Sequence, residues 1–326
     1  MLLSRFAESL YWAGRYLERA EATARLVRVH TELYLDLPRA AGVGWSPLLA
    51  VTGAGEEFLD RHTGPEEDDV VAFLAIDPKN RGSVLASIAQ ARMSLQLSRV
   101  LLPTASFEVV NKLHDWAAAN PAAAIDRRTR LAWMDEVIER CQLMAGSLAG
   151  TMCDDEAYGF LQIGRYLERA DMTIRVLDVQ AAVLVGQPGE DAGGEPYHDV
   201  TWMSVLRSLA AHQMFRRSEG GQGGGVPGPA AVRFLLREER FPRSVEFCLA
   251  STARTLGALP RAALPLASCA RVRARLRDLR PADLDAPGEL HELADDLESG
   301  VGALHDVLTQ TYFRLVAAPP AMVEPA

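Results

Sequence analysis

The strongest constraint on the fold of this chain is a seven-residue segment that occurs twice. The letters GRYLERA stand at 14–20 and again at 164–170. Extending the comparison to 14–29 and 164–179 gives 10 identical residues in 16 positions. More matches follow in the same order at similar separations: Trp45 with Trp202, Phe58 with Phe215, Phe73-Leu74 with Phe234-Leu235, and Ser83-Val84 with Ser244-Val245. This series predicts a duplicated unit of about 150 residues.

The hydrophobic pattern within each unit is helical. Apolar residues recur at alternating steps of three and four positions at Leu10, Ala13, Leu17, Ala20, Ala24 and Val27. Similar steps occur in 83–101, 131–148, 202–215, 244–256 and 290–316, and no segment alternates as a strand does. The fold class that this predicts is all-α, an internally duplicated helical bundle with approximate two-fold pseudo-symmetry.

The duplication also predicts the domain limits. We assign 1–152 to the first helical repeat, 153–316 to the second, and 317–326 to a flexible tail. Glycine and proline are concentrated at 186–196 and 219–229, which we expect to be flexible loops. Because the link near Cys153 is short, we expect the two repeats to share one core.

Composition excludes several classes of function. The formal net charge of −9 argues against general nucleic-acid binding, which needs a basic surface. No apolar stretch is long enough for a membrane span. The four cysteines contain no CxxC pair, so we expect buried thiols in a cytoplasmic protein.

A charged row lies opposite the apolar stripe of the first helix, and the second copy has the same row. The two rows are Tyr11, Arg15, Glu18, Ala22 and Arg25, and Leu161, Arg165, Glu168, Met172 and Arg175. Exposed ion pairs contribute only about 0–1 kcal/mol, so an ordinary solvated face has no reason to keep identical charges. The repeated row therefore predicts a specific contact.

One candidate for that contact is the other repeat. If the two related helices cross near a pseudo-two-fold axis, the expected ion pairs are Arg15 and Arg19 with Glu168, and Arg165 and Arg169 with Glu18. A network of this kind is partly buried and fixes the register of the two helices.

The other candidate is a ligand or substrate. Arg15 and Arg165 would hold a carboxylate or phosphate, and Glu18 or Glu168 would act as a general base. The arginines expected to complete the pairing are Arg19, Arg25, Arg169 and Arg175. The two interpretations are compatible if a cleft lies at the interface.

Other constellations predict little. The histidines include no HxxxH pair, and the one Glu-x-x-His, from Glu195 to His198, lies in a proline-containing loop, so we expect no metal site. The glycine run at 223–228 follows no predicted strand and the chain has no Walker lysine, so we expect no cofactor. There is no GxSxG elbow for a nucleophile.

Four segments of the chain resemble the alpha-E family, a bacterial domain of unknown function. They are Ser4–Glu21, Asp155–Asp178 with the second GRYLERA, Phe241–Val245, and Leu304–Phe313. Members of that family are similar all-helical proteins encoded beside, or fused to, a circularly permuted ATP-grasp ligase. Transglutaminase-like cysteine peptidases are other frequent neighbours. The chain departs from the family where Ala22 replaces the usual Asn and where 92–96 lacks a charged segment, which weakens a site in the first half.

The resemblance implies a function in peptide or amide-bond synthesis. The leading expectation is a helical partner protein of an ATP-grasp peptide or amide ligase, which binds the ligase or a peptide substrate through the Arg/Glu-rich surface between the repeats. One alternative is an enzyme that acts on the ligase product, with Glu18 or Glu168 as general base. A second alternative is a structural scaffold in which the charged rows only join the repeats.

Overall fold

The computed structural model describes residues 2–38, 44–185, 198–218, 225–279 and 287–314, and every regular element in these ranges is helical. The chain is therefore all-α, as the hydrophobic spacing predicts. The helices of the first half are α1 (Ser4–Asp36), α2 (Ser46–Val51), α3 (Gly55–Leu59), α4 (Glu67–Ala75), α5 (Val84–Leu97), η2 (Arg99–Leu101), α6 (Thr104–Ala119), α7 (Pro121–Ile125) and α8 (Arg130–Thr151). Those of the second half are α9 (Glu156–Val185), α10 (His198–Ser208), α11 (His212–Arg217), α12 (Gly228–Arg237), α13 (Val245–Gly257), α14 (Ala263–Arg277), α15 (Pro287–Leu308) and η5 (Thr309–Phe313).

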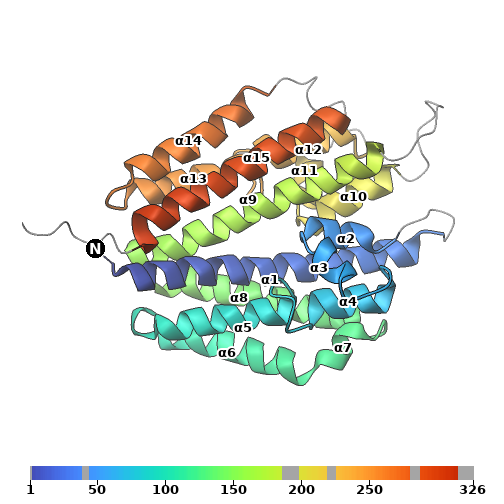
Figure 1. The fold of residues 1–326 in the computed structure, drawn as a ribbon, viewed down its shortest axis with the longest axis horizontal. Helices are drawn as coiled ribbons and strands as arrows, with labels where there is room; N and C mark the ends of the chain where they lie inside the picture. Colours follow the sequence, from blue (N-terminus) through green and yellow to red (C-terminus); the bar gives the residue numbers. More distant parts are fainter. Residues whose placement is uncertain (1, 39–43, 186–197, 219–224, 280–286, 315–326) are drawn as a thin grey trace, which may run out of the picture.

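The centre of the molecule is a pair of long helices, α1 and α9, which run in the same direction (Figure 1). They approach most closely at the glycine of each GRYLERA segment. A Cβ on Gly14 would lie 2.2 Å from the Leu161 carbonyl oxygen, and a Cβ on Gly164 would lie 2.0 Å from the Tyr11 carbonyl oxygen. Only glycine permits this backbone contact, so the repeated glycine is explained by the crossing.

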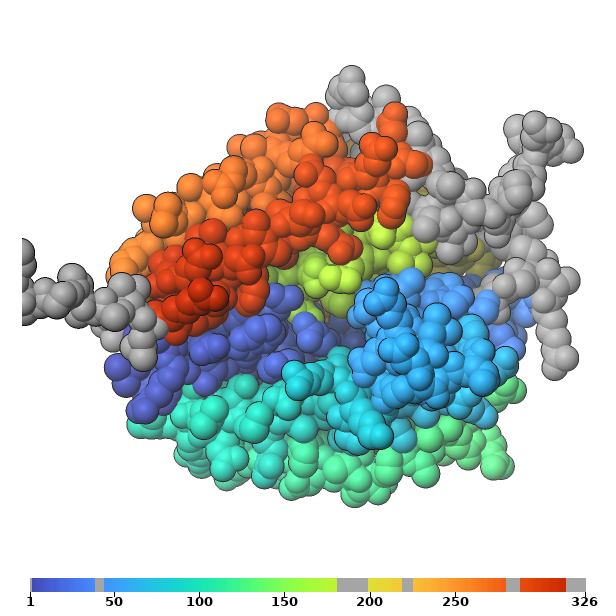
Figure 2. Space-filling view, in the orientation of Figure 1, coloured from blue at the N-terminus to red at the C-terminus, as the bar shows by residue number. Residues whose placement is uncertain are grey.

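Each central helix is enclosed by three helices of its own half. α1 packs against α5 and α8, and α6 covers both; α9 packs in the same way against α13 and α15, and α14 covers both. Figure 2 shows the two groups on opposite sides of the molecule, with α1 and part of α9 visible between them. The two four-helix groups thus have the same contact pattern, and the internal duplication itself stays a prediction from the sequence.

Local signals at matched positions produce matched helix starts. Ser83 and Ser244 are the N-caps of α5 and α13, and each side chain accepts a hydrogen bond from the backbone N–H three residues later. The short link between α8 and α9 includes Cys153, near the predicted limit between the repeats, while the predicted tail at 317–326 lies outside the described residues. The division into domains also stays a prediction.

Two expectations need correction. The segment 202–215 is not one helix, because α10 ends at Ser208 and Ala210 adopts a left-handed conformation with φ of 53° before α11 begins. Cys153 is exposed, whereas the other three cysteines are buried as expected. Within the described ranges, no helix combines the length and the apolar character that a membrane crossing requires.

Candidate functional site: a buried arginine–glutamate network

The charged rows of α1 and α9 face each other across the helix crossing. Glu18 and Glu168 are only 2% and 1% exposed, although both are ionisable. Burying a carboxylate is very unfavourable unless it is paired and hydrogen-bonded. We call the groups around these two carboxylates the Arg–Glu network, and its members are Arg15, Glu18, Arg19, Glu21, Arg165, Glu168, Arg169 and Arg243.

Glu168 is held by two arginines of the opposite helix. Arg15 Nε donates to Glu168 Oε2 at 2.5 Å, and Arg19 Nε donates to Oε1 at 2.6 Å. A second bond from Arg19 Nη2 to Oε2 is 3.1 Å long. Both carboxylate oxygens are therefore occupied by charge-assisted hydrogen bonds.

Glu18 is held by three arginines. Arg169 Nε lies 2.8 Å from Glu18 Oε1, and Arg165 Nε lies 3.3 Å from Oε2. The third is Arg243, in the loop before α13, whose Nη1 donates to Oε1 at 2.6 Å. The four cross-helix pairings expected from the sequence are present, and Arg243 is an addition that the sequence did not indicate.

The outer arginines of the rows, Arg25 and Arg175, do not pair across the α1–α9 crossing, although Arg25 joins the Arg–Glu network through Glu21. Arg25 pairs with Glu21 of its own helix at 2.5 Å. Arg175 pairs with Asp171 at 3.3 Å and with Glu298 of α15 at 3.5 Å. Both lie more than two helical turns beyond the crossing glycines, where the two helices no longer bring their side chains together.

The network holds its carboxylates in the ionised state. Burial alone would raise the pKa of Glu18, but the guanidinium groups of Arg243, Arg169 and Arg165 together hold it well below its usual value. At Glu168, burial again acts to raise the pKa, but Arg15 and Arg19 hold the pKa below its usual value. A carboxylate with a lowered pKa and occupied oxygens is a weak proton acceptor, so the geometry does not favour a general base here.

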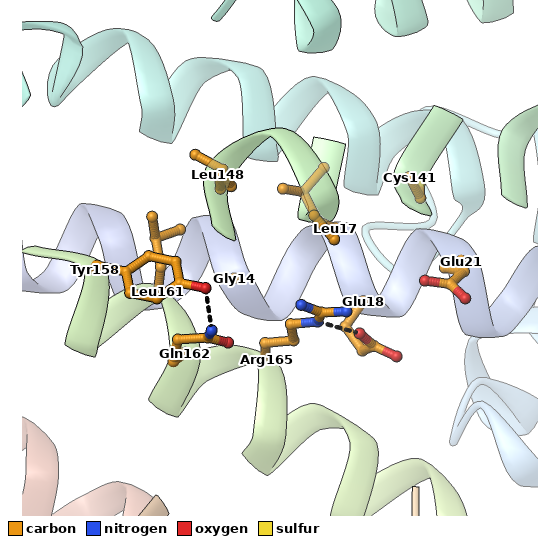
Figure 3. A pocket seen from close by; sticks show the side chains of 11 residues that line it. Gly14, Leu17, Glu18, Glu21, Cys141, Leu148, Tyr158, Leu161, Gln162 and Arg165 are labelled. Carbon is orange, nitrogen blue, oxygen red and sulfur yellow. Dashed lines mark hydrogen bonds and ion pairs between the residues drawn. The ribbon is translucent and has the colours of Figure 1, made fainter. Parts of the chain in front are cut away.

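The space beside the network is small. A cavity of about 30 Å³ lies between Glu18, Cys141, Tyr158, Gln162 and Arg165 (Figure 3). That volume admits a water molecule, whereas pockets that bind small molecules have volumes of roughly 300–1,000 Å³. The rows therefore form a closed, mutually paired interface and not the open binding surface between the repeats that the leading expectation requires.

A hydrogen-bonded chain links the network to the surface. Arg15 Nη1 donates to the Tyr11 hydroxyl at 3.0 Å, and that hydroxyl lies 2.8 Å from Nδ1 of His305 on α15. Burial raises the pKa of Tyr11, and burial together with the nearby Arg15 lowers the pKa of His305. The Arg15 guanidinium is thus held by Glu168 through Nε and by Tyr11 through Nη1, and it is not free to turn toward a ligand.

One group of metal-ligating residue types lies elsewhere, on the surface between α9 and α15. Asp178, His291 and Asp295 each have a ligand-type atom within 4.8 Å of the others. His291 is hydrogen-bonded to Asp178, which raises the pKa of the imidazole. His291 and Asp295 are exposed, and exposed acidic groups are common without a bound ion, so the grouping alone does not indicate a metal site.

Sequence reasoning missed Glu21 and Arg243. Glu21 is 2% exposed and accepts a bond of 2.6 Å from Arg243 Nη2. It stands at the position that Asp171 occupies in the second copy, so an acidic residue common to both copies was the available signal. Arg243 had no such signal in the repeat, because the matching position in the first half is Gly82, but it lies in the segment Phe241–Val245 that carries the family resemblance.

Comparison with known proteins places these features in a family. A family model described as a predicted alpha-helical domain with a conserved ER motif matches residues 2–313. The chain belongs to the Alpha-E family. Its Glu18-Arg19 and Glu168-Arg169 pairs both lie in the Arg–Glu network.

The chain is also similar to uncharacterized proteins of Mycobacterium tuberculosis and Mycobacterium bovis, named Rv2567 and Mb2597. Each is 24% identical over 95% of this chain. The chain spans 37% of the length of these relatives. No solved structure matches it.

The comparisons carry no information on the roles of single residues. The catalytic role of Glu18 and Glu168 stays a prediction, as does ligand binding by Arg15, Arg19, Arg25, Arg165, Arg169 and Arg175. The geometry favours the structural alternative, since every one of these groups has an internal partner.

Proposed function

We propose that this Alpha-E protein is a non-catalytic helical partner of an ATP-grasp peptide or amide ligase, and that it contacts the ligase through its outer surface. The observation that carries the proposal is the closure of the Arg–Glu network around Glu18 and Glu168. A substrate has no room beside these carboxylates, so the enzyme alternative loses its general base.

The length of the relatives supports a partner role. In the mycobacterial proteins, the region similar to this chain is joined to further sequence that makes up most of the polypeptide. A helical unit that is covalently joined to other sequence in some proteins is suited to work beside a separate chain in others. The link to an ATP-grasp ligase comes from the resemblance stated above and is the part that an experiment must establish.

The network supplies what a docking module needs, which is a rigid frame. Five guanidinium groups and two carboxylates fix the relative register of α1 and α9, and the two glycines fix their separation. The outer helices of both repeats are thereby held in a defined arrangement. A surface with a fixed shape loses little conformational entropy on binding.

The test is co-expression with the ATP-grasp ligase of the same organism. We expect the two proteins to elute together in size-exclusion chromatography, and we expect ATP-dependent amide-bond formation by the ligase to increase when the helical protein is present. Separate elution together with an unchanged ligase rate would overturn the proposal.

A variant distinguishes the partner from the enzyme. Glu168→Gln keeps the shape of the side chain and removes its charge, so a partner should lose thermal stability and still support the ligase at temperatures where it remains folded. If the folded variant binds the ligase normally and the product of the complete system no longer forms, Glu168 acts in catalysis and the partner proposal fails.

A further inference from the structure

The described surface has a large hollow in which half of the lining residues are arginine. It has a volume of about 700 Å³ and lies between α11, α12 and the loop that leads to α13. These helices are found behind α9 and α15 in Figure 1, away from the N-terminus. Four arginines and one glutamate line it, namely Arg217, Arg233, Arg237, Arg240 and Glu238. We call this surface the basic groove.

The charge of the basic groove is unusual for this protein. Four guanidinium groups and one carboxylate give the lining a formal charge of +3, whereas the whole chain carries −9. Arg240 pairs with Glu238 at 3.3 Å, and Arg237 donates to the Leu279 carbonyl oxygen. Within the described ranges, Arg217 and Arg233 have no ion-pair partner, and both exposed side chains line the groove.

Two of these arginines have no counterpart at the matching positions in the first half of the chain. The sequence VRFLLR at 232–237 of α12 matches VAFLAI at 71–76 in and just after α4, at the same separation as the other repeat matches. Ala72 and Ile76 stand where Arg233 and Arg237 stand in the second half. Like charges four residues apart destabilise a helix, so the second half has gained an unfavourable pair that its counterpart lacks.

The spacing of the arginines fits a particular ligand. Residues four apart on a helix have Cβ atoms about 5–6 Å apart, which is close to the roughly 6.6 Å between alternate side chains of an extended peptide. The groove continues beside Met214, Phe241 and Pro242, which form a more apolar end. We propose that the basic groove binds an extended acidic segment of a partner protein, with carboxylates at alternate positions. A long polyanion such as nucleic acid fits less well, because the rest of this acidic chain would repel it.

This inference rests on the proposed function only in assuming that the protein has a protein partner, and it can be tested without the ligase. The probe is a fluorescein-labelled nonapeptide of sequence AEAEAEAEA, titrated with the full chain and followed by fluorescence polarisation. We expect saturable binding that weakens at 0.5 M salt, on the order of the concentration at which exposed charges are screened. The same peptide with glutamine in place of glutamate should not bind.

The variant Arg217→Gln with Arg233→Gln removes two guanidinium groups that have no ion-pair partner among the described residues. Each exposed pair contributes about 0.2–1 kcal/mol, which is up to about a fivefold change in affinity, so we expect the loss of two pairs to weaken binding by roughly 2- to 25-fold. The control variant is Arg81→Gln with Arg254→Gln, which removes the same charge from two exposed arginines outside the groove lining. Equal weakening in both variants would show a general charge effect and overturn the proposal.

The result separates this inference from the proposed function. If the ligase co-elutes with the protein and the acidic peptide does not bind, the basic groove proposal fails and the partner proposal stands. If a single-stranded DNA oligonucleotide binds more tightly than the peptide and is lost in the groove variant, the occupant is a nucleic acid and the peptide proposal fails. If the peptide binds and the ligase does not, the groove serves another partner.

Discussion

The tight crossing of α1 and α9 makes Gly164 a position where one methyl group should have a large effect. The Cβ of Gly164→Ala would lie 2.0 Å from the Tyr11 carbonyl oxygen and 3.2 Å from the Arg15 nitrogen. An ordinary carbon–oxygen contact is about 3.3 Å or longer, so the helices must separate by about 1 Å or more. Because the clash is with backbone, we expect the upper end of the usual overpacking range, about 3 kcal/mol of lost stability.

That loss can be measured by thermal unfolding. At about 2.1 cal/mol/K per residue, the unfolding entropy of the 326-residue chain is roughly 0.7 kcal/mol/K, so the transition should fall by about 4 °C. The control is Gly146→Ala in α8, where an added Cβ meets nothing within 4 Å. Alanine is preferred over glycine inside a helix by about 0.5–1 kcal/mol, so this variant should be slightly more stable than the parent. The close-crossing argument is refuted if Gly164→Ala unfolds at or above the temperature of the parent.

Three further outcomes follow from the burial and pairing of the charged and thiol groups. Glu168→Gln should lower the free energy of unfolding in urea by about 3–5 kcal/mol, because Arg15 and Arg19 lose a buried counter-charge; a change below 1 kcal/mol would contradict a buried pair. The pKa of Glu18 in the folded protein lies below its ordinary value of 4.5. The ionised side chain therefore stabilises the fold above pH 4.5, and this stabilisation is lost as the pH falls below 4.5 toward the folded pKa. We expect the loss of stability with falling pH to be less steep in Glu18→Gln than in the parent. Cys153 is exposed, while burial raises the pKa of Cys248 to about 12, so a thiol reagent at pH 8 should label one thiol in the native protein and four in urea.

The general architecture was accessible from the sequence because it depends on local periodicity and on an exact repeat. The apolar stripe of α1 predicts the helix, whereas the role of Gly14 and Gly164 at the crossing is seen only in the structure. The pairing of Glu168 with Arg15 and Arg19 followed from symmetry alone, since equivalent residues near a two-fold axis must approach each other.

The other features of the site depend on three-dimensional geometry that cannot be inferred from the spacing of residues in the sequence. The crossing of two helices is local, so Arg25 and Arg175 pair with acidic residues of their own helices and not across the crossing. Arg243 reaches Glu18 from a loop whose path is set by the packing of α13, and no spacing rule connects positions 225 residues apart. The sequence also could not predict that the interface is closed, because closure depends on how many side chains pack together.

The differences between the two halves indicate where the function of this chain lies. A buried ionic network can be replaced by apolar residues without loss of stability in some proteins, so its presence in both GRYLERA segments is best explained by the need to fix one register between two nearly identical helices. Fixing this register involves equivalent residues of both helices and requires no other molecule. The asymmetric features, Arg243 in place of Gly82 and the arginines of α12 in place of Ala72 and Ile76, all lie in the second half. Arg243 has a structural role in the Arg–Glu network, whereas Arg233 is exposed and has no ion-pair partner within the described ranges. On the basic groove proposal, contact with another molecule accounts for Arg233.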